Sequence, residues 1–447
     1  MHVIVVGAGE VGSYVAELLT RHGNDVAVIE TDRQRLRDIG DRLDVLVVQG
    51  SGTHPRVLSD AGLSRTDLFV AVTSNDEVNL ISALLAKQAG VERTVVRIEA
   101  EELRGRDGQE LRDAIDADLV IDPDAETAAE ILDLLEAPGA TEIAHLAGGE
   151  VFVIGATLDA EAPLCGRTLS EIAAQYEPDW EFLVAARTRA GETVIPRADE
   201  EIMADDHLYM ISKKRAKRDV IKLLGLKAGT HRRVMLLGGG RTAEIVARSL
   251  SARSGAVTLI ERDPVRAREL AEDLDGVLVL EGDITDAELL AAEEAGSYDA
   301  VVALTGQDEA NILACLYAKS LGARETIAVL HRLALRELLE DIGIDVALSP
   351  RTASANGVLR FVRGGVARVA TFLGADFEVI EVEVAAGSKA DGALIRDLDF
   401  SKNALIGAFV RDGKAQIGRG RSELRLRDHV VVFVRPQNVD AVRQIFE

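Results

Sequence analysis

The stretch VIVVGAGEVGSYVAELL, residues 3–19, decides the fold of this chain. It joins a short β-branched run to an amphipathic helix pattern through the turn GAGEVG, residues 7–12. Glycines at this spacing between a strand and a helix form the GxGxxG pattern of a dinucleotide-binding βαβ unit. The free N–H groups and the positive dipole end of such a helix attract phosphate. The stretch therefore predicts a Rossmann-like unit with a nucleotide at its glycine turn.

The same pattern occurs a second time. Residues 234–250 read VMLLGGGRTAEIVARSL, and their first glycine follows Gly7 by 231 residues. Farther along, LFVAVTSNDEVNLISALLAKQAG (68–90) matches AVVALTGQDEANILACLYAKSLG (300–322) at a spacing of 232 residues. A match of this length at nearly constant spacing indicates a tandem duplication.

Each copy alternates short apolar runs with amphipathic stretches. Such apolar strands are typical of a parallel sheet that helices cover on both faces. The alternation predicts an α/β fold with two Rossmann-like, doubly wound parallel-sheet domains. In the first copy the expected strands are Val3–Val6, Val26–Ile29, Val45–Val48, Phe69–Val72 and Val95–Ile98.

A strand-rich and turn-rich segment follows each large unit, from about residue 149 to 225 and from about residue 377 to 447. Each segment places an Asp-His pair before its last strand, and each closes with a helix pattern. We expect two small α+β domains, with His207 and His429 as structural residues in turns. The predicted domains are 1–137, 138–226, 231–363 and 366–447, in the order large, small, large, small.

Composition narrows the possible functions. Asp and Glu number 75 against 51 Lys and Arg, for a formal net charge of −24, which argues against nucleic acid as a partner. An acidic, lysine-poor surface is typical of a protein that functions at high salt concentration, where excess carboxylates keep it solvated. Cys165 and Cys315 form no disulfide framework, and neither the histidines nor any Ser-His-Asp set predicts a metal or catalytic site. The N-terminus lacks a signal-peptide pattern and no apolar run approaches about 18 residues, so we expect a soluble cytoplasmic chain.

The first nucleotide site is predicted at the carboxyl edge of the first large sheet. Glu30, 23 residues after Gly7, can accept hydrogen bonds from both ribose hydroxyls and repels a 2′-phosphate, which favours NAD or ATP over NADP. Arg97 either reaches the phosphates or forms a surface ion pair. The predicted residues of this site are Gly7, Ala8, Gly9, Glu10, Val11, Gly12, Glu30, Thr73, Ser74 and Arg97.

The second copy carries GGGRTA at residues 238–243, in which alanine replaces the third glycine, an accepted variant. Arg262, next to the acid of this copy, either stacks on adenine or faces solvent. Val329 stands where the first copy has Arg97. The predicted residues of the second site are Gly238, Gly239, Gly240, Arg241, Thr242, Ala243, Glu261, Thr305 and Gly306.

Two further patterns have mainly structural interpretations. Ser74 to Glu77 fits a capping box with Ser74 as the N-cap residue. The run KKRAKR, residues 213–218, is the one basic stretch and is expected to open the last helix of the first small domain. It forms either a solvated helix face or a contact with a membrane-protein loop.

The run VVQGSGTHPRVLSDAGLSRTDLFVAVTSNDEVN (47–79), the two glycine turns and QDEAN (307–311) resemble the TrkA family of Trk potassium-uptake regulators. The resemblance covers essentially the whole chain, with RCK N-terminal domains as the large units and RCK C-terminal domains as the small ones. It implies no enzyme but a cytosolic gating ring, a homotetramer docked beneath an integral membrane potassium-transporting subunit. It also implies binding of NAD(H), and of ATP or ADP in some members.

Two alternatives remain at this point. The ring could serve another cation channel or exchanger, or the chain could be an NAD-dependent dehydrogenase. A dehydrogenase needs a substrate domain that presents a general acid or base, and the small segments show no such constellation. Gly306 and Val329 depart from the first copy, which leaves the ligand of the second site open.

Overall fold

The computed structural model describes residues 1–21, 23–100, 103, 115–177, 180–226, 233–253, 255–332, 342–350, 352, 358, 361, 366–371, 377–398, 400 and 404–447. The chain forms two compact units. One unit comprises Met1–Thr127 with Ser349–Val362, and the other comprises Ala128–Leu348 with Arg363–Glu447.

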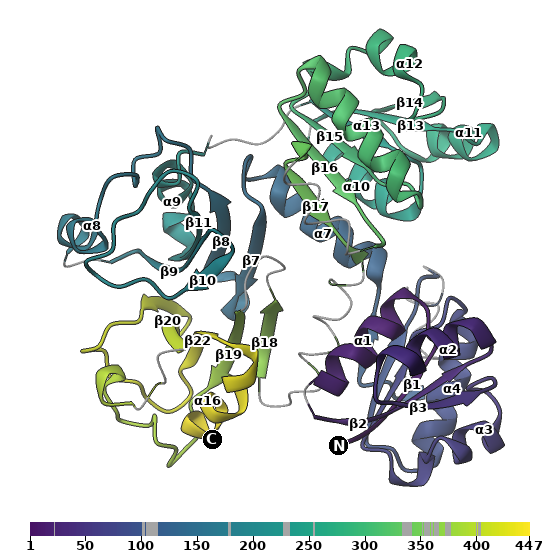
Figure 1. The fold of residues 1–447 in the computed structure, drawn as a ribbon, viewed down its shortest axis with the longest axis horizontal. Helices are drawn as coiled ribbons and strands as arrows, with labels where there is room; N and C mark the ends of the chain where they lie inside the picture. Colours follow the sequence, from purple (N-terminus) through teal and green to yellow (C-terminus); the bar gives the residue numbers. More distant parts are fainter. Residues whose placement is uncertain are drawn as a thin grey trace. The chain divides into compact units, whose positions relative to one another are not determined.

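The first unit is built on a six-stranded parallel sheet in the order β3-β2-β1-β4-β5-β6, covered by helices on both faces (Figure 1). The five predicted strands are confirmed within one or two residues. A sixth, β6, was missed because three residues make too short an apolar run. The strands are β1 His2–Val6, β2 Asp25–Glu30, β3 Leu46–Gln49, β4 Leu68–Ala71, β5 Arg93–Arg97 and β6 Leu119–Ile121, and the helices are α1 Glu10–Arg21, α2 Arg33–Arg42, α3 Pro55–Asp60 and α4 Asp76–Gln88.

The core of the first unit includes a residue from the far half of the sequence. Val358 is 1% exposed and lies in one apolar cluster with Val3, Val15 and Leu19. Nearby, the guanidinium of Arg93 lies 4.9 Å from the ring centroid of Phe361 and donates to its carbonyl. No periodicity or motif in the sequence indicates this insertion.

The second unit contains the repeat of the large sheet, in the order β14-β13-β12-β15-β16-β17 and again parallel. The duplicated sequence therefore produces a duplicated topology. The strands are β12 Arg233–Leu237, β13 Ala256–Glu261, β14 Val277–Glu281, β15 Ala300–Ala303, β16 Glu325–Val329 and β17 Val346–Leu348, and the helices are α10 Arg241–Ser251, α11 Pro264–Asp273, α12 Ala287–Ala292 and α13 Asp308–Leu321.

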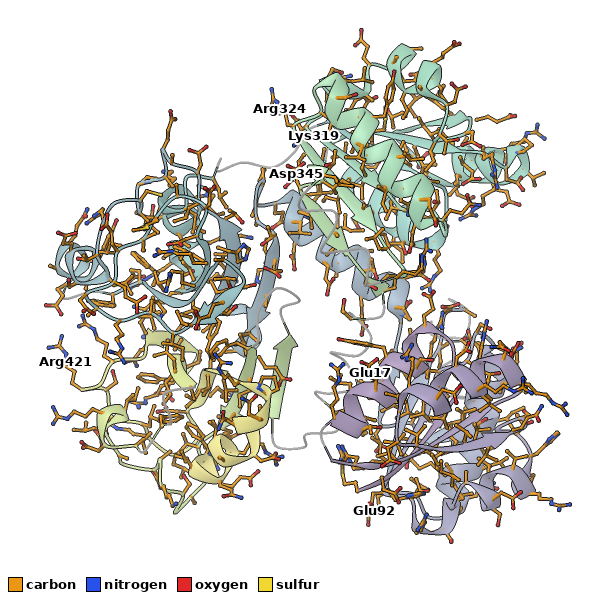
Figure 2. The ribbon with its side chains drawn as sticks, in the orientation of Figure 1. Glu17, Glu92, Lys319, Arg324, Asp345 and Arg421 are labelled. Atoms are coloured by element: carbon orange, nitrogen blue, oxygen red, sulfur yellow. The ribbon has the colours of Figure 1, made fainter. Side chains whose placement is uncertain are left out.

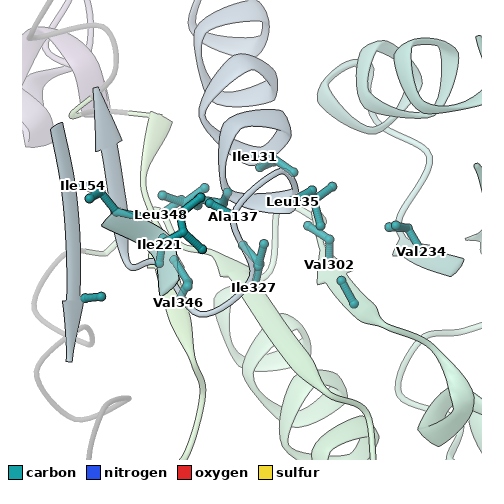
Figure 3. Packing of buried hydrophobic residues seen from close by; sticks show 14 of the residues in the cluster. Ile131, Leu135, Ala137, Ile154, Ile221, Val234, Val302, Ile327, Val346 and Leu348 are labelled. Atoms are coloured by element: carbon teal, nitrogen blue, oxygen red, sulfur yellow. The ribbon is translucent and has the colours of Figure 1, made fainter. Parts of the chain in front are cut away.

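Helix α7, Pro123–Leu135, links the large domains in an unexpected way. This helix falls within the first predicted domain, 1–137. From Ala128 onward, however, it packs in the second unit, where Ile131 and Leu135 share a cluster with Val302 and Ile327 (Figure 3). Apolar spacing predicts a buried helix face and does not say which sheet buries it.

The two small domains are five-stranded antiparallel sheets in the orders β10-β9-β11-β8-β7 and β18-β19-β22-β20-β21. One face of each sheet contributes to a shared apolar cluster that includes Val153, Tyr209, Val431 and Phe433. The elements are β7 Glu142–Leu146, β8 Val151–Thr157, α8 Leu169–Tyr176, β9 Phe182–Arg189, β10 Glu192–Val194, β11 His207–Lys213 and α9 Lys217–Leu223, then β18 Val366–Thr371, β19 Glu378–Glu383, β20 Ala404–Arg411, β21 Lys414–Ile417, β22 His429–Val434 and α16 Val439–Phe446.

The Asp-His pairs do not lie in turns as predicted, because each histidine is the first residue of a strand. His207 Nε2 lies 3.3 Å from Glu142 Oε2, and His429 Nδ1 lies 3.2 Å from Glu381 Oε1. The preceding aspartate is buried in both copies. The aspartate therefore has a structural role directly before the strand, and the turn residues in the sequence do not predict its burial.

The basic run 213–218 also differs from expectation. It begins at the last residue of β11 and passes through a 3₁₀ turn before α9 starts at Lys217. Lys213 and Arg215 both pair with Glu181, and Lys217 Nζ lies 3.4 Å from Glu136. Part of the positive charge is thus neutralised inside the second unit.

Paired charges tie the last strand of each large sheet to the preceding helix. Lys319 Nζ lies 2.7 Å from Asp345 (Figure 2), and Lys87 Nζ lies 2.8 Å from Asp118 in the first copy. A search of the described residues for membrane-spanning helices finds none of sufficient length and hydropathy. The same residues contain no group of three or more His, Cys, Asp or Glu side chains that could hold a metal ion.

Candidate functional site

The first glycine turn brings helix α1 against the sheet. Gly7 has a φ of +103°, which glycine adopts at little cost, and α1 begins at Glu10. A Cβ atom on Gly12 would lie 1.9 Å from the carbonyl oxygen of Gly7. Gly7 and Gly12 therefore serve the turn and the helix packing.

Glu30, the last residue of β2, is connected to this turn. Its Oε2 accepts a hydrogen bond from the Ala8 N–H at 2.8 Å, and its Oε1 accepts from the N–H groups of Thr31 and Asp32 at 2.7 and 3.0 Å. Burial by itself would raise the pKa of this carboxyl. The hydrogen bonds from Asp32, Ala8 and Thr31 outweigh burial and hold the pKa below its usual value.

A buried asparagine joins the ends of strands β4 and β5. Asn79 Oδ1 accepts from the Thr73 N–H at 2.8 Å and from its hydroxyl at 2.7 Å. Its amide donates to the carbonyls of Thr73 and Arg97 at 3.0 and 3.1 Å. All four capacities of the side chain are used, so Asn79 fixes the sheet edge on which the predicted site residues lie.

The predicted capping box at α4 is wrong. Asn75 is the N-cap residue, and its Oδ1 accepts from the Val78 N–H at 2.7 Å. Ser74 lies one residue earlier and is exposed. Asp76 instead accepts from the N–H groups of Glu99 and Ala100 at 2.9 and 2.8 Å and holds the chain after β5.

Arg97, the last residue of β5, forms an ion pair with Glu99. Its side chain is 19% exposed, and its buried Nε has no hydrogen-bond partner in the described part of the chain. Of the two alternatives for Arg97, the structure contains the ion pair, and it lies at the same sheet edge as Thr73.

The second copy contains a cleft of about 470 Å³ at the carboxyl edge of its sheet. Six of the nine residues predicted for the second site line it, and Arg241, Thr242 and Ala243 do not. The lining residues are Gly238, Gly239, Gly240, Glu261, Arg262, Asp283, Ile284, Thr285, Leu304, Thr305, Gly306, Gln307 and Ala310.

The acid of the second copy repeats the arrangement of the first. Glu261 Oε2 accepts from the Gly239 N–H at 2.6 Å, and Oε1 accepts from Asp263 at 2.7 Å. Asn311 repeats the contacts of Asn79, with its amide donating to Thr305 and Val329 at 2.8 Å each. The local geometry of both sites is thus set by the same residue types.

Two glycines in the turns have no packing reason to be glycine. A Cβ on Gly9 would meet only Arg35 Nη1 at 3.9 Å, and one on Gly240 would meet only the Leu304 carbonyl at 4.0 Å. The missing side chains leave open space beside the peptide N–H groups at the helix start. That space fits a pyrophosphate, which needs close backbone approach.

Sequence reasoning missed several residues at these sites. Asp283 and Thr285 line the second cleft, and their position directly after β14, at the edge where parallel strands end, could have identified them. Arg266 donates to the Gly239 carbonyl at 3.1 Å and pairs with Glu244 at 2.7 Å. Asn79 and Asn311 occupy the same place in the matching stretches 68–90 and 300–322. The presence of asparagine in both copies is the signal that could have identified them.

Family comparison agrees with the duplication. The TrkA-N domain family matches residues 3–130 and 234–350, and the TrkA-C domain family matches residues 153–225 and 379–447. The chain belongs to the TrkA family. The resemblance found in the sequence is therefore confirmed, as is the tandem α/β and α+β fold.

Relatives of this TrkA-family chain match it over its whole length. A Trk system potassium uptake protein TrkA homolog of Archaeoglobus fulgidus is 34% identical, with 100% of both chains covered. A Trk system potassium uptake protein TrkA of Halomonas elongata is 34% identical, with 97% of this chain and 96% of the relative covered.

Solved structures share the fold. A crystal structure of the GsuK RCK domain has a TM-score of 0.63 at 17% identity and covers 100% of this TrkA-family chain and 94% of its own. The GsuK channel bound to NAD has a TM-score of 0.63 at 16% identity and covers 100% and 78%.

Proposed function

We propose that the chain is the regulatory gating-ring subunit of a Trk-type potassium transport system. In this role it couples binding of NAD(H), ATP or ADP to potassium uptake through a membrane subunit. The observation that carries the proposal is the duplicated site in which a glycine turn, an open space beside it and an acid hydrogen-bonded to the turn occur together at residues 7–30 and 238–261.

The acid favours one class of nucleotide. Glu30 and Glu261 end the second strand of their sheets, where a carboxylate accepts hydrogen bonds from ribose hydroxyls and repels a 2′-phosphate. NADPH is therefore expected to bind more weakly than NADH or an adenine nucleotide. The bound group supplies no chemistry in this role and acts only by its binding free energy.

A regulatory role also explains the absence of a predicted catalytic set. We propose a homotetrameric ring at the inner face of the cell membrane, with membrane contact only through an integral potassium-transporting subunit and no nucleic acid partner. The proposed domain boundaries stay at 1–137, 138–226, 231–363 and 366–447. The full-length relatives, which are Trk system potassium uptake proteins, support this proposal over a different cation channel or a dehydrogenase.

Coupling requires a difference in affinity between two states of the ring. A nucleotide shifts the membrane subunit only as far as it binds one conformation more tightly than the other. Couplings between sites are typically about 1–3 kcal/mol, which corresponds to roughly 5–150-fold in affinity.

The test has a binding arm and a transport arm. Purified chain is titrated by calorimetry with NADH, NAD, NADPH, ATP and ADP at high KCl, and Gly9→Asp and Gly240→Asp each fill one open space. We expect each substitution to remove one binding site with the melting temperature retained. In cells that depend on a Trk system for potassium, nucleotide-dependent uptake that survives the double variant would overturn the proposal.

A further inference from the structure

The pair Arg97–Glu99 exists in only one of the two repeated sites. Arg97 ends β5, and Glu99 follows two residues later on the chain that Asp76 holds. In the second copy Val329 ends the equivalent strand, and the chain after it is held in the same way by Asp308 through the N–H groups of His331 and Arg332 at 2.8 and 2.9 Å. The fold therefore does not need the ion pair.

Contacts connect the strand end that carries Arg97 to the glycine turn of the first site. A Cβ on Gly7 would lie 3.1 Å from Thr73, and Asn79 bonds to the carbonyls of both Thr73 and Arg97. This short chain of contacts connects the glycine turn to the end of β5. Because the bonds run through the backbone, the Arg97 side chain can change partner while the strand end stays fixed.

The guanidinium is only partly satisfied by Glu99. Nη2 pairs with the carboxylate, whereas the buried Nε has no hydrogen-bond partner within the described residues. Guanidinium groups bind phosphate and carboxylate through two parallel N–H donors. The existing contact with Glu99 leaves Nε without an acceptor, and a phosphate group could accept from Nε and Nη2 together.

We propose that Glu99 is an internal competitor for the nucleotide phosphates and lowers the affinity of the first site for ligands whose phosphates bind Arg97. The inference rests on the proposed nucleotide function. Arg97 pairs with Glu99 when no phosphate is present and turns to the phosphates when a nucleotide di- or triphosphate binds. Adenosine, which has no phosphate, leaves the pair intact, so its affinity does not depend on Glu99, and the second site lacks this competitor.

The experiment uses the full-length chain with the second site blocked by Gly240→Asp, so that calorimetry reports on the first site. Adenosine, ADP and ATP are titrated at one fixed KCl concentration. Glu99→Gln is expected to raise the affinity for ADP and ATP by about tenfold and to leave adenosine unchanged. Arg97→Gln is expected to lower ADP and ATP affinity by at least about tenfold, and adding Glu99→Gln to it should have no further effect.

Matched controls separate this mechanism from a general effect. Glu92→Gln removes an exposed carboxylate on the same unit and should change nothing. In a Gly9→Asp background, which reports on the second site, Glu99→Gln should also leave ADP binding unchanged. An equal gain for adenosine and ATP, or a gain at the second site, would overturn the competition.

The outcomes distinguish this inference from the function on which it rests. Nucleotide binding that is indifferent to Glu99→Gln overturns the competitor role and leaves the nucleotide site standing. Absence of any nucleotide binding in the unmodified chain overturns the proposed function itself, together with this inference.

Discussion

The carboxylate of Glu30 accepts a hydrogen bond from the backbone N–H of Ala8 at 2.8 Å, so the acid at the end of β2 is fixed to the glycine turn. Glu261 makes the same contact with Gly239 at 2.6 Å. In each site the group expected to bind ribose also orders the turn expected to bind phosphate. Binding and local stability are therefore linked through one side chain.

The linkage predicts a pH dependence. The pKa of Glu30 is lower in the folded chain, because its hydrogen bonds outweigh its burial. Its stabilising contribution is therefore fully present above the pKa of the unfolded chain and is lost as the pH falls through the depressed folded-state pKa. Glu30→Gln should lower the melting temperature at pH 7 and flatten its decline below about pH 5. Glu92→Gln is the control, and an unchanged pH profile in Glu30→Gln would contradict the prediction.

The third glycine of the first turn is predicted to be strictly required. A Cβ on Gly12 would overlap the Gly7 carbonyl, whereas the second copy accommodates Ala243 at the same place. Gly12→Ala should therefore destabilise the first unit by about 1–3 kcal/mol. Ala243→Gly should cost only about 1 kcal/mol, through helix propensity. Urea unfolding followed by circular dichroism checks both, and equal midpoints for the two variants would argue against this packing difference.

Substitution of Asn79 or Asn311 is predicted to lower the stability of the chain, because each side chain makes hydrogen bonds with two strand ends. Asn79→Asp keeps the acceptor for Thr73 but removes the donors to two carbonyls, which should cost roughly 1–3 kcal/mol for each unsatisfied buried group. Faster hydrogen exchange at the Thr73 amide in Asn79→Ala would report the loosened strand end. Asn75→Ser, which retains an N-cap side chain, should be nearly neutral. Hydrogen exchange at the Thr73 amide of Asn79→Ala as slow as in the unmodified chain would contradict the role of Asn79 in holding the strand end.

The small domains contain a repeated ion pair between a buried aspartate and a partly exposed arginine. Asp206, which is fully buried, meets Arg189 through two contacts at 2.5 and 2.7 Å, and Asp428 meets Arg411 at 2.8 and 2.6 Å. Asparagine cannot accept all the hydrogen bonds that the buried carboxylate accepts, so Asp206→Asn and Asp428→Asn should each cost roughly 1–3 kcal/mol. Differential scanning calorimetry compares them with Glu17→Gln.

Glu17 belongs to an exposed pair with Arg21, which is expected to contribute less than about 0.5 kcal/mol. Burial alone would raise the pKa of Asp206, but hydrogen bonds from Arg189 and Met203 lower it. The contribution of this pair should therefore persist above the unfolded-chain pKa and disappear as the pH falls through the folded-state value. A melting temperature for Asp206→Asn as high as that of Glu17→Gln would contradict the role of the pair.

The strands and helices of this protein, and their repetition, could be predicted from the order of its residues alone. Local signals were sufficient where the physical cause is local. Gly7 permits a turn at positive φ, and apolar runs form strands that are buried on both faces. In both βαβ units the acid follows the first glycine of the turn by 23 residues. The duplication made each of these signals visible twice, which is why the fold class could be predicted and why candidate site residues could be proposed at matching places in both copies.

Which sheet covers an apolar helix face, and which anion a charged side chain pairs with, become visible only in the folded chain. Val358 fills the core of the first unit, α7 packs on the second large sheet, and Arg97 pairs with Glu99. The pattern of an apolar helix face is the same whichever sheet covers it, and an arginine can pair with any anion within its reach. Such choices depend on long-range packing and on competition among charges, which spacing along the chain does not encode.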